Sequence, residues 1–187
     1  MQRSKKILLI SHCLLNVNSK VNKLANYQGT LEELIIPLMK KGYGFIQLPC
    51  PEMLAYGIKR WGQVKDQYDT PYYRKHVKKL LEPILEQLLD YYKNGYTICG
   101  CIGIDGSPNC GVYKTCKAEN WEGEIGSINT MPALEYILNS LKEVPEKGIF
   151  IEEFQILLNQ NKLNLPFFAV DEAYPTFSIQ NILKELL

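Results

Sequence analysis

The feature that most constrains the fold is a succession of short apolar runs separated by longer segments with helical periodicity. Runs at residues 6–11, 44–48, 96–102 and 166–170 predict buried parallel strands, because strands covered on both faces are apolar throughout. Strands that alternate with helices favour a parallel sheet with helices on both faces. We therefore predict one Rossmann-like α/β domain over residues 1–187.

The expected helices rest on start signals and apolar spacing. Thr30 followed by Glu33 forms a capping box, which predicts a helix start. Pro71 suits a first helical position, and a long helical pattern over 72–92 follows it. Pro83 inside this pattern predicts a kink, or a break between two helices. Further helices are expected over 132–141, 150–159 and 177–187, with a short strand start before the second of these and irregular structure over 112–128.

The composition is that of an ordinary globular chain, with 46% hydrophobic and 22% charged residues. The formal net charge of +1 gives no global basis for binding nucleic acid or a membrane surface. The N-terminal stretch MQRSKKILLISHCLL imitates a secretion signal, but its short apolar run and the lack of a small-residue cleavage site favour a first strand. We expect a cytoplasmic protein without a nucleic-acid or membrane partner.

Three of the six cysteines follow three predicted strands. Cys13 and Cys50 each follow one of the first two strands with one residue between, and Cys110 lies in the loop after the third. Because ligands bind outside the carboxyl ends of parallel strands, we expect these thiols to converge. Three converging thiolates need a cation, and soft sulfur suits zinc, copper(I) or iron–sulfur clusters. From the spacing alone, it is equally possible that these three cysteines only fill the protein core. With only two histidines in the chain, a metal site would have to rely on thiolates.

The loop GIDGSPNCG around Cys110 carries few bulky side chains. Gly106 and Gly111 are expected to let the backbone approach a bulky inorganic group, to which its N–H groups could donate hydrogen bonds. Ser107 in the same loop, and Glu52 shortly after the second cysteine, would add a hydroxyl and a carboxylate. These are the parts that general acid–base catalysis requires.

The motifs ISHCLLN, LPCPE and GSPNCG, in this order, resemble those of the thiouracil desulfurase family. The resemblance implies a [4Fe-4S] cluster held by Cys13, Cys50 and Cys110, with Ser107 and Glu52 beside the substrate. It also implies that a thiocarbonyl sulfur binds the iron that has no protein ligand. Cleavage of the carbon–sulfur bond would then be hydrolytic and release sulfide. The implied substrate is a thiouracil-like nucleobase.

The chain also departs from the family pattern. Asn109 stands where the family usually has a second serine, and Arg60 is the nearest match to its Pro-Arg after the second cysteine. The link to Tyr27 is longer and rich in Lys and Asn. These differences favour a larger thionucleobase derivative as substrate. Two other functions stay open: a non-catalytic iron–sulfur binding or sensor protein, and a zinc-thiolate or cysteine-nucleophile enzyme.

The remaining notable residues are expected to be structural. Cys99 and Cys101 should lie on one face of the third strand as core residues. Cys116 should be a free thiol in a polar loop, and His12 a hydrogen-bonded core residue. Paired tyrosines on the long helix indicate helix flanks or a homodimer face: Tyr72, Tyr73, Tyr91 and Tyr92.

Overall fold

The centre of the fold is a parallel sheet. The structure, a computed structural model, describes residues 2–187. Within these residues the sheet has four strands in the order β2-β1-β3-β6, all paired in parallel. The strands are β1 (Lys6–Ile10), β2 (Gly44–Gln47), β3 (Thr97–Asp105) and β6 (Phe167–Asp171). The predicted Rossmann-like α/β class is thereby confirmed.

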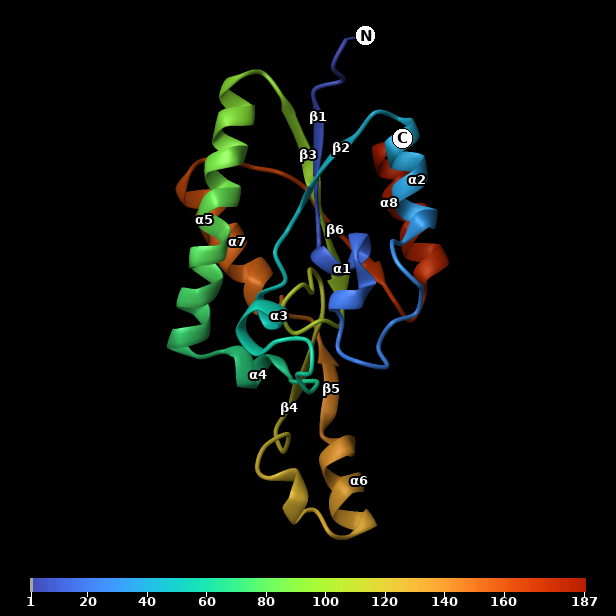
Figure 1. Cartoon of the computed structure of the whole chain (residues 1–187), viewed down its shortest axis with the longest axis vertical. Helices are drawn as coiled ribbons and strands as arrows, with labels where there is room; N and C mark the ends of the chain where they lie inside the picture. The colour runs from blue at the N-terminus through green and yellow to red at the C-terminus, as the bar shows by residue number, and fades with distance from the viewer. Residues whose placement is uncertain (1) are drawn as a thin grey trace.

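Helices cover both faces of this sheet (Figure 1). One face carries α5 (Pro71–Lys93) and α7 (Ile149–Gln160), and the other carries α2 (Glu32–Lys40) and α8 (Pro175–Leu186). Each face has its own buried core, because successive strand residues point to opposite sides. Leu9 therefore packs with the α5 and α7 residues, whereas Leu8 packs with those of α2 and α8.

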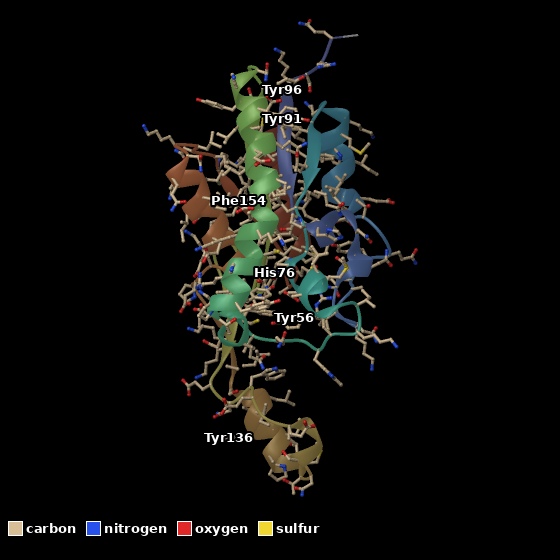
Figure 2. The ribbon with its side chains drawn as sticks, turned by 60° about the vertical axis from the view of Figure 1, so that its left-hand side comes forward. Tyr56, His76, Tyr91, Tyr96, Tyr136 and Phe154 are labelled. Atoms are coloured by element: carbon tan, nitrogen blue, oxygen red, sulfur yellow. The ribbon has the colours of Figure 1, made fainter. Side chains whose placement is uncertain are left out.

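The second sheet is a two-stranded antiparallel ribbon that projects from the body and carries α6 at its far end (Figure 1). Tyr136 marks this far end in Figure 2. The remaining elements are α1 (His12–Leu15), η1 (Val17–Ser19), α3 (Pro51–Tyr56), α4 (Lys65–Tyr68), β4 (Thr115–Ala118), η2 (Ile125–Ser127), α6 (Met131–Asn139) and β5 (Leu141–Val144). The irregular segment predicted over 112–128 is interrupted by β4 and η2, and β4 forms there by pairing with the distant strand β5.

The long helix α5 is continuous through Pro83, so the predicted alternative of a break is wrong. It begins at Pro71 as expected, with Thr70 Oγ1 accepting a hydrogen bond from the Tyr73 N–H at 3.2 Å. No helix among residues 2–187, α5 included, combines the length and apolar character needed to cross a lipid bilayer.

Two predicted starts of elements are also wrong. The Thr30 hydroxyl does not cap α2 but donates to the Leu15 carbonyl at 2.9 Å, so α2 begins at Glu32. The short strand expected before residue 150 does not form, because Gly148 is the N-cap of α7. In both places a tertiary contact replaces the local preference.

Cys99 and Cys101 lie on opposite faces of β3, contrary to the prediction. The pairing of β1 with β3 shifts register between Ile7 and Leu8, which marks a β-bulge in β3. Cys101 consequently packs in the core under α5 and α7, and Cys99 packs against the other core.

Phe154 tests how strongly the α7 face stabilises the sheet. This side chain is fully buried, with Phe167 in edge contact at a centroid distance of 6.1 Å. Phe154→Ala should lower the free energy of unfolding by about 3–5 kcal/mol, because it removes apolar area and leaves a cavity. Phe177→Ala is the matched control, since Phe177 is 68% exposed and should change stability by less than about 0.5 kcal/mol. Urea denaturation measures both, and equal effects would contradict the described core.

Candidate functional site: three thiols at the carboxyl edge of the sheet

The three cysteines that the sequence singled out follow three adjacent strands. Cys13 lies in α1 directly after β1, Cys50 is the N-cap of α3 after β2, and Cys110 lies in the loop after β3. Since β2, β1 and β3 are neighbours and run in parallel, their carboxyl ends meet at one edge. Figure 1 shows α1 and α3 at this edge.

The thiols are close enough to affect one another's ionisation. Burial, with a smaller contribution from Cys50, raises the pKa of Cys13 to about 12. Burial also raises the pKa of Cys110, and Cys13 and Cys50 are the next causes. Mutual effects of this kind require nearby groups, so the three side chains lie in the same part of the sheet edge. Without a cation these thiols stay protonated, which disfavours a bare cysteine nucleophile.

The arrangement of donors bears on which metal could bind. Across residues 2–187, no group of three or more His, Cys, Asp or Glu side chains is arranged to hold a single metal ion. A zinc ion needs its ligands around one point. A cluster instead takes each cysteine on a different iron, so its ligands stand apart. Three partly exposed thiols are a donor set that a sulfur-rich cluster can use.

Helix α7 holds the loop of the third cysteine in place. The N–H groups at the start of a helix lack partners within the helix. Here Ile149 N donates to the Pro108 carbonyl at 3.0 Å, and Ile151 N donates to the Asn109 carbonyl at 3.2 Å. Gly148 N donates to the Gly111 carbonyl at 2.9 Å. The helix start and the loop thus satisfy each other's backbone groups.

Ser107 fixes the backbone around Cys110. Its hydroxyl oxygen accepts hydrogen bonds from the N–H groups of Cys110 at 3.0 Å and Asn109 at 3.3 Å. Asp105 orders the next segment, because its Oδ1 accepts from Val112 N at 3.0 Å and Tyr113 N at 2.9 Å. The Ser107 hydroxyl keeps its own proton available for another acceptor.

The glycines of this loop are accounted for by its own packing. A Cβ on Gly111 would come within 2.8 Å of the Ser107 carbonyl oxygen. Gly106 has a φ of +81°, a backbone angle that residues with a Cβ rarely adopt. A Cβ there would also lie 3.0 Å from the Glu143 side chain. A role of Gly106 and Gly111 in holding a cofactor stays a prediction.

Glu52 is held at the site from both sides. Its Oε2 accepts from Arg60 Nε at 3.1 Å, and its Oε1 accepts from Asn109 Nδ2 at 2.9 Å. Arg60 also donates to the Ser19 carbonyl at 2.8 Å, which ties the segment after β1 to α3. Asn109, only 1% exposed, thereby joins the loop of Cys110 to the catalytic candidate Glu52.

Buried polar atoms without partners gather at this same edge. In the part of the chain that the structure describes, they are Ser11 Oγ, His12 Nδ1, Tyr68 Oη, Tyr73 Oη, Asn109 Oδ1 and Glu153 Oε2. Glu153 has Lys78 at 3.4 Å as an ionic partner away from the cysteines. The others belong to the site: Ser11 lies close enough to lower the pKa of Cys110, although no regular hydrogen bond forms. Native proteins rarely leave such atoms unsatisfied, so their gathering indicates a binding site.

Lysine also reaches the site. Lys20 forms an ion pair with Glu172, which follows β6, and its charge lowers the pKa of Cys13. The Lys20 side chain is only 11% exposed. A cation is thus placed beside the first thiol.

Two surface hollows can be placed relative to the cysteines. One of about 640 Å³ adjoins the site through His12 and Pro49, the residues just before Cys13 and Cys50. Burial lowers the pKa of His12, so its imidazole is neutral. A second hollow, of about 510 Å³, lies between α4 and the ribbon of β4 and β5. Neither of these two hollows is lined by the three cysteines.

The sequence analysis did not consider Tyr68, and it placed Tyr73 on a helix flank or a homodimer face, which is wrong because Tyr73 is fully buried. Tyr73 belongs to the buried stripe of α5 with Val77 and Leu81, a spacing of four that could have indicated it. Tyr68 has no comparable signal, because α4 is a single short turn. Cys116 lies in β4 rather than in a loop.

Fold and site together define an α/β protein with a parallel sheet and three thiols gathered at its carboxyl edge. The chain belongs to the family of the uncharacterized protein MJ0003 of Methanocaldococcus jannaschii. The two are 41% identical over 140 residues, which cover 73% of this chain and 89% of the relative. Models of known protein families give no match, and neither do solved structures.

Gly148 tests the contact between α7 and the cysteine loop. A Cβ at this position would come within 2.8 Å of Asn109 Cα, with the Asn109 carbonyl still nearer. Gly148→Ala should therefore destabilise the protein by about 1–3 kcal/mol through overpacking. Gly62→Ala is the control, because nothing lies within 4 Å of the added Cβ. Thermal unfolding compares the two, and an unaffected Gly148→Ala variant would contradict the described contact.

Proposed function

We propose that this protein is a hydrolytic desulfurase that removes sulfur, as sulfide, from a small thiocarbonyl compound of the thiouracil type. A [4Fe-4S] cluster held by Cys13, Cys50 and Cys110 would be its cofactor. The observation that carries the proposal is the delivery of three partly exposed thiols to one edge by three adjacent parallel strands. The resemblance of the motifs around these cysteines to those of thiouracil desulfurases supports the same conclusion.

The donor set suits such a cofactor because it supplies three thiols and leaves one position for a ligand. When bound, the cluster supplies an iron that polarises a carbon–sulfur double bond as a Lewis acid. The Lys20 ammonium beside Cys13 offers a counter-charge for the sulfur-rich site. The raised pKa of each free thiol is consistent with cysteines that ionise only when a metal binds.

The protein's own residues provide the acid–base and positioning groups. Glu52 accepts a proton from the attacking water, and Arg60 and Asn109 keep its carboxylate in place. Ser107 holds the loop of Cys110 and can donate its remaining hydroxyl proton to the substrate. The reaction exchanges the thiocarbonyl sulfur for oxygen and is balanced by water and hydrogen sulfide, without a redox partner.

Of the alternatives, a cysteine nucleophile would need a lowered thiol pKa, whereas burial raises the pKa of all three thiols. A zinc-thiolate enzyme would need ligands around one point. A sensor that binds a cluster without turnover differs from the desulfurase in activity alone. A cytoplasmic location, with all six cysteines unpaired, belongs to the same proposal.

Cluster binding is tested by anaerobic reconstitution with iron and sulfide. The wild-type protein should turn brown and hold about four irons and about four sulfides per chain. Cys110→Ala should lose most of this iron. Cys116→Ala is the matched control, because Cys116 lies in β4, outside the three strand ends, and it should keep the wild-type content. Retention of full iron by Cys110→Ala would rule out the ligand assignment.

Turnover is tested by sulfide release from a panel of thiouracils and thiouridines. In the reconstituted protein, Glu52→Gln should lower kcat by roughly 10²–10⁴-fold, because it removes the acid–base group. Iron content should stay at the wild-type level. Glu86→Gln, on the exposed side of α5, should leave the rate unchanged. Wild-type rates in Glu52→Gln would remove Glu52 from the mechanism, and no release by loaded wild-type protein would favour the sensor.

A further inference from the structure

The helix α6, at the end of the ribbon, leaves its apolar side chains in water. We call residues 115–144, from the start of β4 to the end of β5, the arm. Within α6, all of which the structure describes, no residue is buried. Met131, Leu134 and Leu138 are 66%, 36% and 49% exposed, and their spacing of three and four residues places them on one face. A contiguous apolar face of this kind marks an interaction surface.

The body of the same chain has an apolar hollow that could receive such a face. This hollow, of about 640 Å³, is lined by Leu54 of α3 and Ile84 of α5 among other apolar side chains. Figure 2 shows His76, which lines the hollow, in the body and Tyr136 of α6 at the far end of the arm. The helix and the hollow of one chain are therefore apart.

Ion pairs fix the base of the arm to the body. Lys65 of α4 contacts Glu146, just after β5, at 2.9 Å and Glu152 of α7 at 2.6 Å. The Lys65 side chain is only 7% exposed, so solvent screens these contacts little. The arm is thus held in its extended position, and α6 can fill this hollow only on a second copy of the chain.

The charge of the arm indicates which surface it can meet. Residues 119–140, between β4 and β5, contain four glutamates and no lysine or arginine. The rest of the chain has 21 basic and 16 acidic residues, a formal charge of +5. Two such arms would repel each other, and an arm would be repelled by nucleic acid or an anionic membrane surface. An arm and the body of a second copy instead attract each other.

The same complementarity holds at the contact itself. Among the described residues, the hollow is lined by the cation Lys79 and by no carboxylate. Glu135 is the one charged residue of α6, and it lies beside the apolar face because it is four residues after Met131 and three before Leu138. A docked α6 would bring Glu135 and Lys79 of two copies together.

We propose that this protein forms a two-fold dimer in which α6 of each copy docks in the hollow between α3 and α5 of the other. Two copies lying side by side in opposite directions along the long axis of Figure 1 place each arm beside the other body. Stable interfaces bury roughly 1,200–2,000 Å² in total, more than one short helix provides, and a two-fold axis makes the contact twice. This inference is independent of the proposed desulfurase activity.

Sedimentation equilibrium of the full chain under reducing conditions tests the dimer. The wild type should sediment at twice the mass of the chain. Leu138→Asp should raise the dimer dissociation constant by about tenfold or more, because it places a carboxylate in an apolar contact. Phe177→Asp is the matched control, since Phe177 of α8 is 68% exposed and lies outside the proposed contact. A monomeric wild type would overturn the proposal and assign α6 to another partner, and so would a dimer that Leu138→Asp leaves unchanged.

The choice of the hollow is tested by charge reversal in the same experiment. Glu135→Lys and Lys79→Glu should each weaken the dimer, because each brings like charges together, and the double variant should recover much of the wild-type affinity. Leu54→Asp, at a residue that is 52% exposed in the hollow, should weaken the dimer as Leu138→Asp does. Circular dichroism and melting temperatures show whether each variant keeps the fold. A dimer weakened by the arm variants alone, without recovery in the double variant, would indicate contact between two arms and overturn the proposed docking site.

Discussion

The parallel pairing of β2, β1 and β3 is the constraint on which the rest of the structure depends. Parallel strands end on the same side, so residues far apart in the chain are delivered to one edge. Cys13, Cys50 and Cys110 each follow one of these strands and come together for that reason. A different strand order would separate the thiols, whatever the local sequence around each of them.

The site combines several features that cost stability. Buried thiols, unpartnered hydroxyls and a tight glycine loop are tolerated because two apolar cores enclose the sheet and α7 braces the loop. The contact of Glu52 with Arg60 and Asn109 links the segments after all three strands into one unit. Departures from local rules are expected at functional sites, and here they coincide with the cysteines.

Much of this arrangement could be predicted from the sequence, because strand ends and alternation with helices are local signals. The gathering of three thiols at one edge of the sheet could be predicted from the same signals. The opposite orientations of Cys99 and Cys101 could not be predicted, since the bulge depends on the register with β1. The ribbon of β4 and β5 forms between strands that α6 separates in the chain. Thr30 does not cap α2 because its hydroxyl donates to the carbonyl of Leu15, a contact between different segments. Tyr68 could not be placed because its position depends on a short turn packed against distant residues.

The most direct measurement of the central claim is an iron-edge anomalous difference map from crystals of anaerobically purified protein. The account predicts one compact iron peak that touches the sulfur atoms of Cys13, Cys50 and Cys110, with one side open toward Glu52. Iron bound elsewhere, or three sulfur atoms pointing away from a common volume in well-ordered density, would contradict it.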